Sequence, residues 1–316
     1  MALLPASANL AINRIMLNSL ARVRLSFAFI IVFVCPAPAR GQGAEPNPPL
    51  ESPARGDVEK LIKTYGADAS VAFRTLDGTQ ELFVQADKPF RSSSAIKIAV
   101  MIELYAEAEA GELRLSDPLL VTSGSQNDAQ PGTPHADAKN DPTYGSIGKT
   151  LTLRELCEAM IARGSLRAES LLIEKLDAAR IRNRLHELGA DGVEFVAPVE
   201  SDTGAAEGSR NTETARDLMV LLWALAKGEA VSPDASQEMM GMLARSIPYQ
   251  GIAAGLPGSQ DAALGTAGFA ENHQEAAIVY GPHSFVIVIV IHDSQNRTAS
   301  FALSAQLAHA LSVPVW

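Results

Sequence analysis

Basic residues are fewer than acidic ones in this sequence, and cysteines and aromatic residues are scarce. The 316 residues include 26 Lys and Arg against 36 Asp and Glu, a formal net charge of −10. This balance disfavours a nucleic-acid partner, because binding to phosphates needs a basic surface. With 47% hydrophobic and 20% charged residues, the composition is that of a globular protein and excludes disordered, collagen-like and polytopic membrane chains.

Two cysteines are too few for a disulfide framework, and the histidines are not spaced as metal ligands. Cys35 lies in an N-terminal apolar run, so a processed chain retains only Cys157 and has no internal disulfide. The six histidines show neither H-x-x-x-H nor H-x-H spacing, and we interpret His273, His283 and His292, on or near expected strands, as structural. The sequence therefore predicts no metal and no cofactor.

The N-terminal apolar run, residues 25–34, is too short to span a bilayer. Arginines precede it and small residues follow, an order typical of a secretory signal peptide cleaved after Ala39, with translation starting at Met1 or Met16. A buried N-terminal strand is the alternative. We predict a signal peptide over 1–39, no membrane span after its removal, and a periplasmic or secreted protein.

Residues 40–56 contain Pro and Glu and predict a disordered linker before a folded domain over 57–316. Hydrophobic periodicity and capping signals place strands near both ends of this domain and helices between them. The expected strands are 69–76, 81–85, 262–269, 275–280 and 285–291. The expected helices are 57–65, 94–110, 152–162, 167–176, 178–188, 212–226, 232–247 and 298–311. Residues 123–148 and 190–210 read as long loops.

This order predicts an α/β fold of the α+β sandwich type. An antiparallel sheet is built from both chain ends and flanked by helices, and an all-helical region is inserted at about 112–258. The unbroken apolar run 285–291 is typical of a central strand covered on both faces. A cleft between the sheet and the helical region is the natural place for a site.

A serine and a lysine three residues apart open the expected helix at 94–110. On a helix, Ser94 and Lys97 share one face, so the lysine amine can reach the serine hydroxyl. The helix start also offers N–H groups that can stabilise an oxyanion. Ser146 and Lys149 repeat the spacing in a Gly-containing loop, where no helix orients them. The alternative for Ser94 is a helix cap beside a surface lysine.

Four segments, 90–105, 151–161, 170–173 and 211–218, resemble the class A serine β-lactamases and their relatives, and the likeness covers about residues 57–312. The resemblance implies a β-lactamase/transpeptidase-like fold and the chemistry of a penicillin-recognising serine hydrolase. In that family the motifs are S-x-x-K, S-D-N, an acidic loop residue and K-T-G. The first is present as Ser94, the nucleophile, and Lys97, which takes its proton.

The second and fourth motifs are degenerate. S-D-N falls on 164–166, where Ser165 is displaced by one position, and K-T-G falls on 265–267 or 266–268 without its lysine. The resemblance then assigns Ser165, Thr266 and Ala267 to substrate binding, with a backbone amide of the 265–268 strand joining that of Ser94 in the oxyanion hole.

The loop acid is Glu200, with Asp202 as the competing candidate and an exposed loop carboxylate as the alternative interpretation. The resemblance as a whole implies a monomer that transfers the acyl group of a β-lactam, a peptidoglycan-derived peptide or a simple ester through Ser94. Activity should be reduced, because the lysine that meets the substrate carboxylate is missing. The alternatives are a degenerate module that binds cell-wall peptides or a protein, and a slow penicillin-binding protein without turnover.

Overall fold

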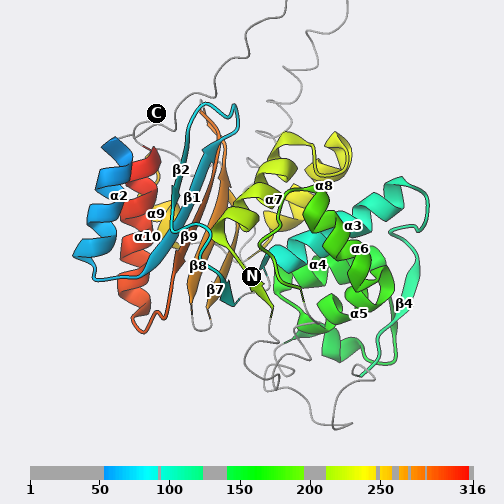
Figure 1. Cartoon of the computed structure of the whole chain (residues 1–316). Helices are drawn as coiled ribbons and strands as arrows, with labels where there is room; N and C mark the ends of the chain where they lie inside the picture. The colour runs from blue at the N-terminus through cyan, green and yellow to red at the C-terminus, as the bar shows by residue number, and fades with distance from the viewer. Residues whose placement is uncertain are drawn as a thin grey trace, which may run out of the picture. The chain divides into compact units, whose positions relative to one another are not determined.

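A five-stranded antiparallel sheet forms the centre of the fold (Figure 1). The computed structural model describes residues 53–91, 94–123, 141–195, 211–246, 250–257, 263–269, 272–281 and 283–312. The sheet strands are β1 (Ala69–Thr75), β2 (Glu81–Val84), β7 (Ala263–Phe269), β8 (His273–Val279) and β9 (Phe285–Ile291), in the order β2-β1-β9-β8-β7. The prediction of an antiparallel sheet drawn from both ends of the domain is confirmed.

Strand β9 lies in the middle of this sheet, and all seven of its residues are buried. Its side chains alternate between the two hydrophobic clusters of the domain. Phe285 and every second residue after it join the cluster under the terminal helices, whereas Val286, Val288 and Val290 join the larger cluster under the helical region. The run of β-branched residues thus serves both faces, as the sequence predicted.

Helices cover both faces of the sheet (Figure 1). One layer consists of α2 (Pro53–Thr64), α9 (Gln250–Gly255) and α10 (Arg297–Ser312). The other consists of α3 (Ser94–Glu109), α4 (Leu153–Arg163), α5 (Leu166–Leu176), α6 (Ala178–Glu187), α7 (Ala215–Lys227) and α8 (Pro233–Leu243). Two small ribbons join β3 (Phe90–Arg91) to β6 (Thr212–Glu213) and β4 (Pro118–Leu120) to β5 (Thr150–Thr152), and η2 (Pro142–Ser146) is a 3-10 helix.

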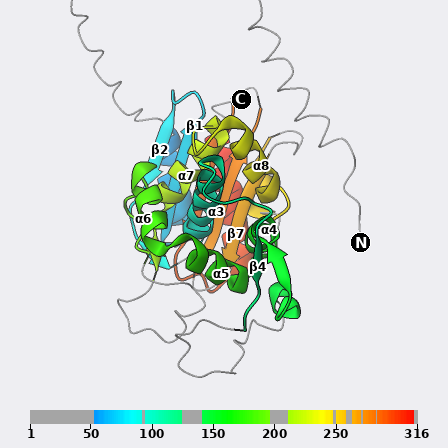
Figure 2. The ribbon, with the colours of Figure 1, turned by 90° about the vertical axis from the view of Figure 1, so that its right-hand side faces the viewer.

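Helix α3 is apolar on nearly all sides, which is typical of a helix buried within a domain. It packs against α4, α5, α6, α7 and α8. Figure 2 shows it in the middle of the helical layer, in front of the sheet. The residues at its start are therefore held by tertiary packing as well as by the helix itself.

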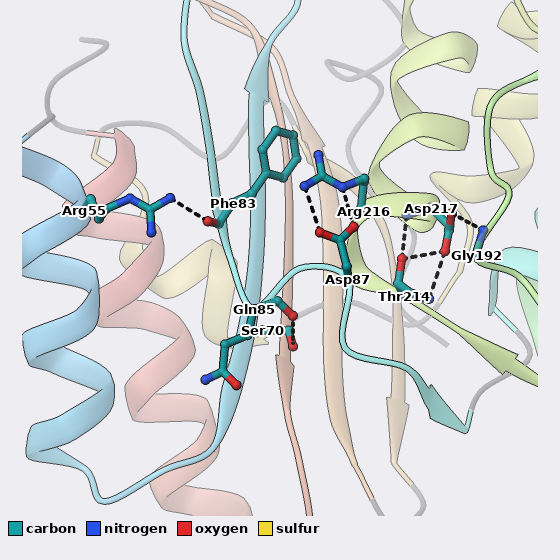
Figure 3. A network of polar contacts seen from close by, with 9 residues as sticks. All are labelled: Arg55, Ser70, Phe83, Gln85, Asp87, Gly192, Thr214, Arg216 and Asp217. Carbon is teal, nitrogen blue, oxygen red and sulfur yellow. Dashed lines mark hydrogen bonds and ion pairs between the residues drawn. The ribbon is translucent and has the colours of Figure 1, made fainter. Parts of the chain in front are cut away.

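The start of α7 is fixed by polar contacts to neighbouring segments (Figure 3). Thr214 and Asp217 form a capping box, and the Gly192 N–H donates to Asp217 Oδ1. Arg216 forms a bidentate ion pair with Asp87, whose pKa is lowered by this contact. These bonds join α7 to the segment that follows β2.

Several predicted boundaries were wrong. Helix α2 begins at Pro53, so residues 53–56 of the predicted linker are helical. Thr212 and Glu213, predicted as the start of a helix, form strand β6 because the capping box starts α7 after Thr214. Helix α9 was not predicted, and η2 lies in a segment predicted to have no regular structure.

The predicted signal peptide and most of the predicted linker lie outside the described residues. Among the helices that are described, none is long and apolar enough to cross a membrane.

Candidate active site

Ser94 is the first residue of α3, and Lys97 follows in its first turn. The Lys97 side chain is 19% exposed, whereas Ile96 and Ile98 on either side of it are fully buried. The structure therefore places the serine and the lysine at the start of a packed helix, where the sequence located them. The second S-x-x-K match, Ser146 and Lys149, has a different environment. Its lysine donates a hydrogen bond to the backbone carbonyl of Gly145 at 3.4 Å.

A buried carboxylate holds the first turn of α3. Glu213 Oε2 accepts the N–H of Ala95 at 2.8 Å, and its Oε1 accepts the side-chain amide of Gln274 at 3.3 Å. Glu213 lies on β6, opposite Phe90 of β3. A negative charge is favourable at a helix N-terminus. Through Glu213, β8 of the central sheet is connected to the residue directly after Ser94.

A second buried carboxylate lies next to Lys97. Glu169, in the first turn of α5, has no exposed surface, and its Oε2 lies 3.6 Å from Lys97 Nζ. The ion pair joins two helices of the helical layer at the position where the predicted nucleophile and its lysine lie. It thus brings an acidic group into the predicted site.

Ser165 caps α5, and its hydroxyl has a complete set of hydrogen bonds. It donates to Asp141 Oδ2 at 2.9 Å, accepts the Ala168 N–H at 3.0 Å, and lies 2.7 Å from Thr143 Oγ1. The residue is fully buried. These contacts account for Ser165 as a structural cap, and its predicted contact with substrate stays a prediction.

The predicted K-T-G segment lies on β7, which is at one edge of the sheet. Thr266 is opposite Ala276 of β8, and Ala267 is opposite Glu275. An edge strand has one side without a strand partner, so its backbone groups can meet a ligand. Glu200 and Asp202 lie outside the described residues.

Other side chains of reactive types in the described residues have structural roles. Burial raises the pKa of the Cys157 thiol to about 12, which excludes a reactive thiolate at neutral pH. His273 Nε2 lies 3.1 Å from Ser304 Oγ and 3.5 Å from Glu275 Oε2. Because one nitrogen meets both groups and all three residues are buried, the cluster lacks the geometry of a catalytic relay.

Sequence reasoning missed Glu169 and Glu213. A signal for Glu169 was present, since it shares the face of α5 with the buried Leu172 and Leu176. An acidic residue on an apolar helix face requires a partner. Glu213 gave no comparable signal, because its strand has only two residues. Among the residues that the structure describes, no group of three or more His, Cys, Asp or Glu could hold a metal ion.

The sheet with helices on both faces, and the serine and lysine at the start of a buried helix, define the β-lactamase/transpeptidase fold. The model of the Beta-lactamase enzyme family matches residues 53–313. The chain therefore belongs to the β-lactamase enzyme family and is class A-like.

Solved structures share this fold at low sequence identity. A β-lactamase from Sphaerobacter thermophilus has a TM-score of 0.69 at 18% identity, covering 83% of this chain and 96% of its own. A class A β-lactamase described as the last common ancestor of Gram-negative bacteria has a TM-score of 0.70 at 21% identity, covering 83% and 99%.

A PBP-A variant in an acyl-enzyme complex with penicillin G has a TM-score of 0.70 at 20% identity, covering 86% of this chain and 98% of its own. A search of curated proteins found no match.

Proposed function

We propose that this chain is an exported serine hydrolase that transfers the acyl group of a β-lactam, or of a related amide or ester, through Ser94. One observation carries the proposal: Ser94 begins a buried helix whose first turn also holds Lys97 and is fixed by Glu213. In the reaction, Ser94 Oγ attacks the carbonyl carbon, its proton passes to Lys97, and backbone amides stabilise the oxyanion.

Hydrolysis of β-lactams by this chain is slow in this proposal. Gly164 carries no hydroxyl and has φ of 69°, which glycine adopts readily, and the hydroxyl of Ser165 is used in the cap. The segment at Thr266 has no lysine. Fewer groups are then available to protonate the leaving nitrogen and to bind the substrate carboxylate.

The same observations favour a second candidate, a penicillin-binding protein that is acylated and does not turn over. The engaged hydroxyl of Ser165 supports this candidate, as does the fold shared with PBP-A. A module that only binds cell-wall peptides or a protein is the remaining alternative. The proposed location is the periplasm or the exterior, and the proposed state is a monomer.

Intact-protein mass spectrometry after incubation with benzylpenicillin tests the proposal. The wild-type chain should gain the mass of one penicilloyl group, and Ser94→Ala should gain none. Ser146→Ala is the matched control, since it removes the serine of the second S-x-x-K match, and it should be acylated as the wild type is. Persistence of the adduct distinguishes a penicillin-binding protein from a hydrolase, and labelling of Ser94→Ala at the wild-type rate would contradict the proposal.

A further inference from the structure

The ion pair between Lys97 and Glu169 lies deep in the helical layer. The Glu169 carboxylate is completely buried, and Lys97 Nζ lies 3.6 Å from its Oε2. Glu169 is on α5 and Lys97 is on α3, so the contact depends on the packing of two helices. The Lys97 side chain is 19% exposed, so Lys97 is the partly accessible member of the pair.

The energetics of burial decide what this pair can do. A buried carboxylate is costly unless a cation or hydrogen bonds compensate it. Moving the proton from the ammonium to the carboxylate converts two charges into two neutral groups, and removal from water favours the neutral forms of both. A proton can therefore move between Lys97 and Glu169 at less cost than between the same groups in water.

Other charged groups on and around α3 make contacts of their own. At the helix start Glu213 accepts from Ala95 and Gln274, and before η2 the Asp141 carboxylate accepts from Ser165 and from the Arg167 amide. Further contacts join charged side chains of α3 and of the helices around it to other groups: Glu103 with Arg184, Glu107 with Arg180, Arg154 with Glu238, Glu158 with Arg245, Asp217 with Thr214, and Arg167 with Thr122. The contact described between Lys97 and a carboxylate is the ion pair with Glu169.

We propose that Glu169 accepts the proton that Ser94 loses on acylation, with Lys97 as the relay. This inference rests on the proposed function. Lys97 first passes its ammonium proton to Glu169, which leaves a free amine. As Ser94 Oγ bonds to the carbonyl carbon, the carbonyl π electrons move to its oxygen and the hydroxyl proton passes to the amine of Lys97. When the intermediate collapses, the bond to the leaving group breaks, Lys97 protonates that group, and Glu169 returns its proton to Lys97.

Glu169 does not touch the substrate in this scheme and is a positioning residue that acts through Lys97. It supplies an acid on a rigid helix next to the lysine. A loop carboxylate is then not required for acylation. The pair is active when its carboxylate and amine share one titratable proton. This state exists between the two titration steps of the pair, so the acylation rate should be constant there.

The pH profile of acylation tests this inference. Formation of the benzylpenicillin adduct is followed by quenched-flow mass spectrometry between pH 6 and pH 9. The wild-type rate should be constant from about pH 6 to pH 8. In Glu169→Gln, Lys97 must lose its proton to solvent, so the rate should fall about 100-fold at pH 7, as loss of a general base commonly causes, and should rise about tenfold per pH unit.

Two further variants separate this role from a structural one. Glu169→Asp keeps the carboxylate and should keep the constant profile at a lower rate. Glu174→Gln removes the same charge from an exposed position of α5 and should behave as the wild type does. If Glu169→Gln does not fold, the wild-type and Glu169→Asp profiles decide the matter.

A wild-type or Glu169→Asp rate that rises tenfold per pH unit through neutrality would overturn the inference, as would a Glu169→Gln profile that stays constant. A uniform loss of rate in Glu169→Gln without a new pH dependence would also overturn it, since that result indicates a structural effect. If the wild-type chain forms no adduct on Ser94 at any pH, the proposed function itself fails, and the inference fails with it.

Discussion

His292 is a single buried side chain whose protonation makes the stability of the fold depend on pH. Its Nε2 lies 2.8 Å from Ser70 Oγ. The Ser70 hydroxyl donates to the carbonyl of Gln85, as Figure 3 shows. The Ser70 oxygen is therefore free to accept, and His292 is the donor in its neutral form. Burial lowers the pKa of His292 below the ordinary value of 6.5, and the Lys88 charge lowers it further.

The first prediction concerns the pH dependence of stability at this histidine. Below pH 6.5 the unfolded chain binds a proton at this position more readily than the folded chain does. The contribution of His292 to the free energy of unfolding should therefore fall as the pH drops from 7 to 5, so the free energy of the wild type should fall relative to that of His292→Gln. Urea unfolding at pH 7, 6 and 5 measures both slopes.

The control is His283→Gln, which replaces an exposed histidine and should keep the wild-type slope. Asp77 and Asp87 do not affect this comparison. The pKa of each carboxyl group is lowered, that of Asp77 to about 2, so their protonation changes the free energy of unfolding at a more acidic pH. Identical slopes for the wild type and His292→Gln would show that His292 titrates alike in both states.

At the scale of single elements, the described helices differ in the contacts that their N-cap residues make. Ser232 caps α8 by accepting the Ala235 N–H, near the surface. Ser165 does the same for α5 and also bonds to Asp141 and Thr143 in a fully buried position. Ser165 therefore joins three segments as well as capping the start of α5.

The second prediction compares these two caps. Ser232→Ala should lower the free energy of unfolding by about 1 kcal/mol, the usual cost of a lost cap. Ser165→Ala should cost about 2 to 4 kcal/mol, because it also leaves buried polar partners without a hydrogen bond. Chemical denaturation of both variants gives the two values. Equal losses would mean that Asp141 and Thr143 find other partners.

At the scale of the whole molecule, the short helix α9 packs closely against α10 and is hydrogen-bonded to the sheet. The Gly255 position in α9 is so near α10 that an added Cβ would lie 2.0 Å from the carbonyl oxygen of Ala305. At the other end of α9, the amides of Gly251 and Ile252 donate to the buried Glu275 of β8. A helix of six residues thus connects α10 to the sheet.

The third prediction uses a pair of glycines. Gly255→Ala should destabilise the fold by about 1 to 3 kcal/mol, because the new methyl group separates α9 from α10. Gly241→Ala in α8 meets no atom nearer than 3.9 Å and should stabilise the protein by about 0.5 to 1 kcal/mol through its higher helix propensity. Thermal unfolding of the two variants measures the difference, and a stable Gly255→Ala would show that the two helices move apart freely.

Features with a local cause could be predicted from the sequence. The bounds of β9 follow from its seven apolar residues, and the capping box of Thr152 and Glu155 fixes the start of α4. The start of α3 at Ser94 follows from the change from polar to apolar residues. In each case the signal lies within a few residues of the feature.

Features that depend on distant contacts could not be predicted in this way. Helix α9 depends on Glu275, and Glu213 depends on the approach of α3 and β8 to a two-residue strand. The pairing of Glu169 with Lys97 requires the packing of α5 on α3. The site could therefore be located from its serine and lysine, while its buried acids needed the tertiary structure.

The pairing of β1 with β9 also has a kinetic consequence. Residues 69–75 pair with residues 285–291, and closing a chain loop of that length costs about 5 kcal/mol of entropy before any contact repays it. Helices α3 to α8 mostly contact segments that are closer in the sequence. The central strand β9 becomes available only when almost the whole chain has been synthesised. Native contacts of such long range slow folding, and until β9 arrives β1 and β8 each lack a neighbour, which leaves open edges on which chaperones or other chains can act.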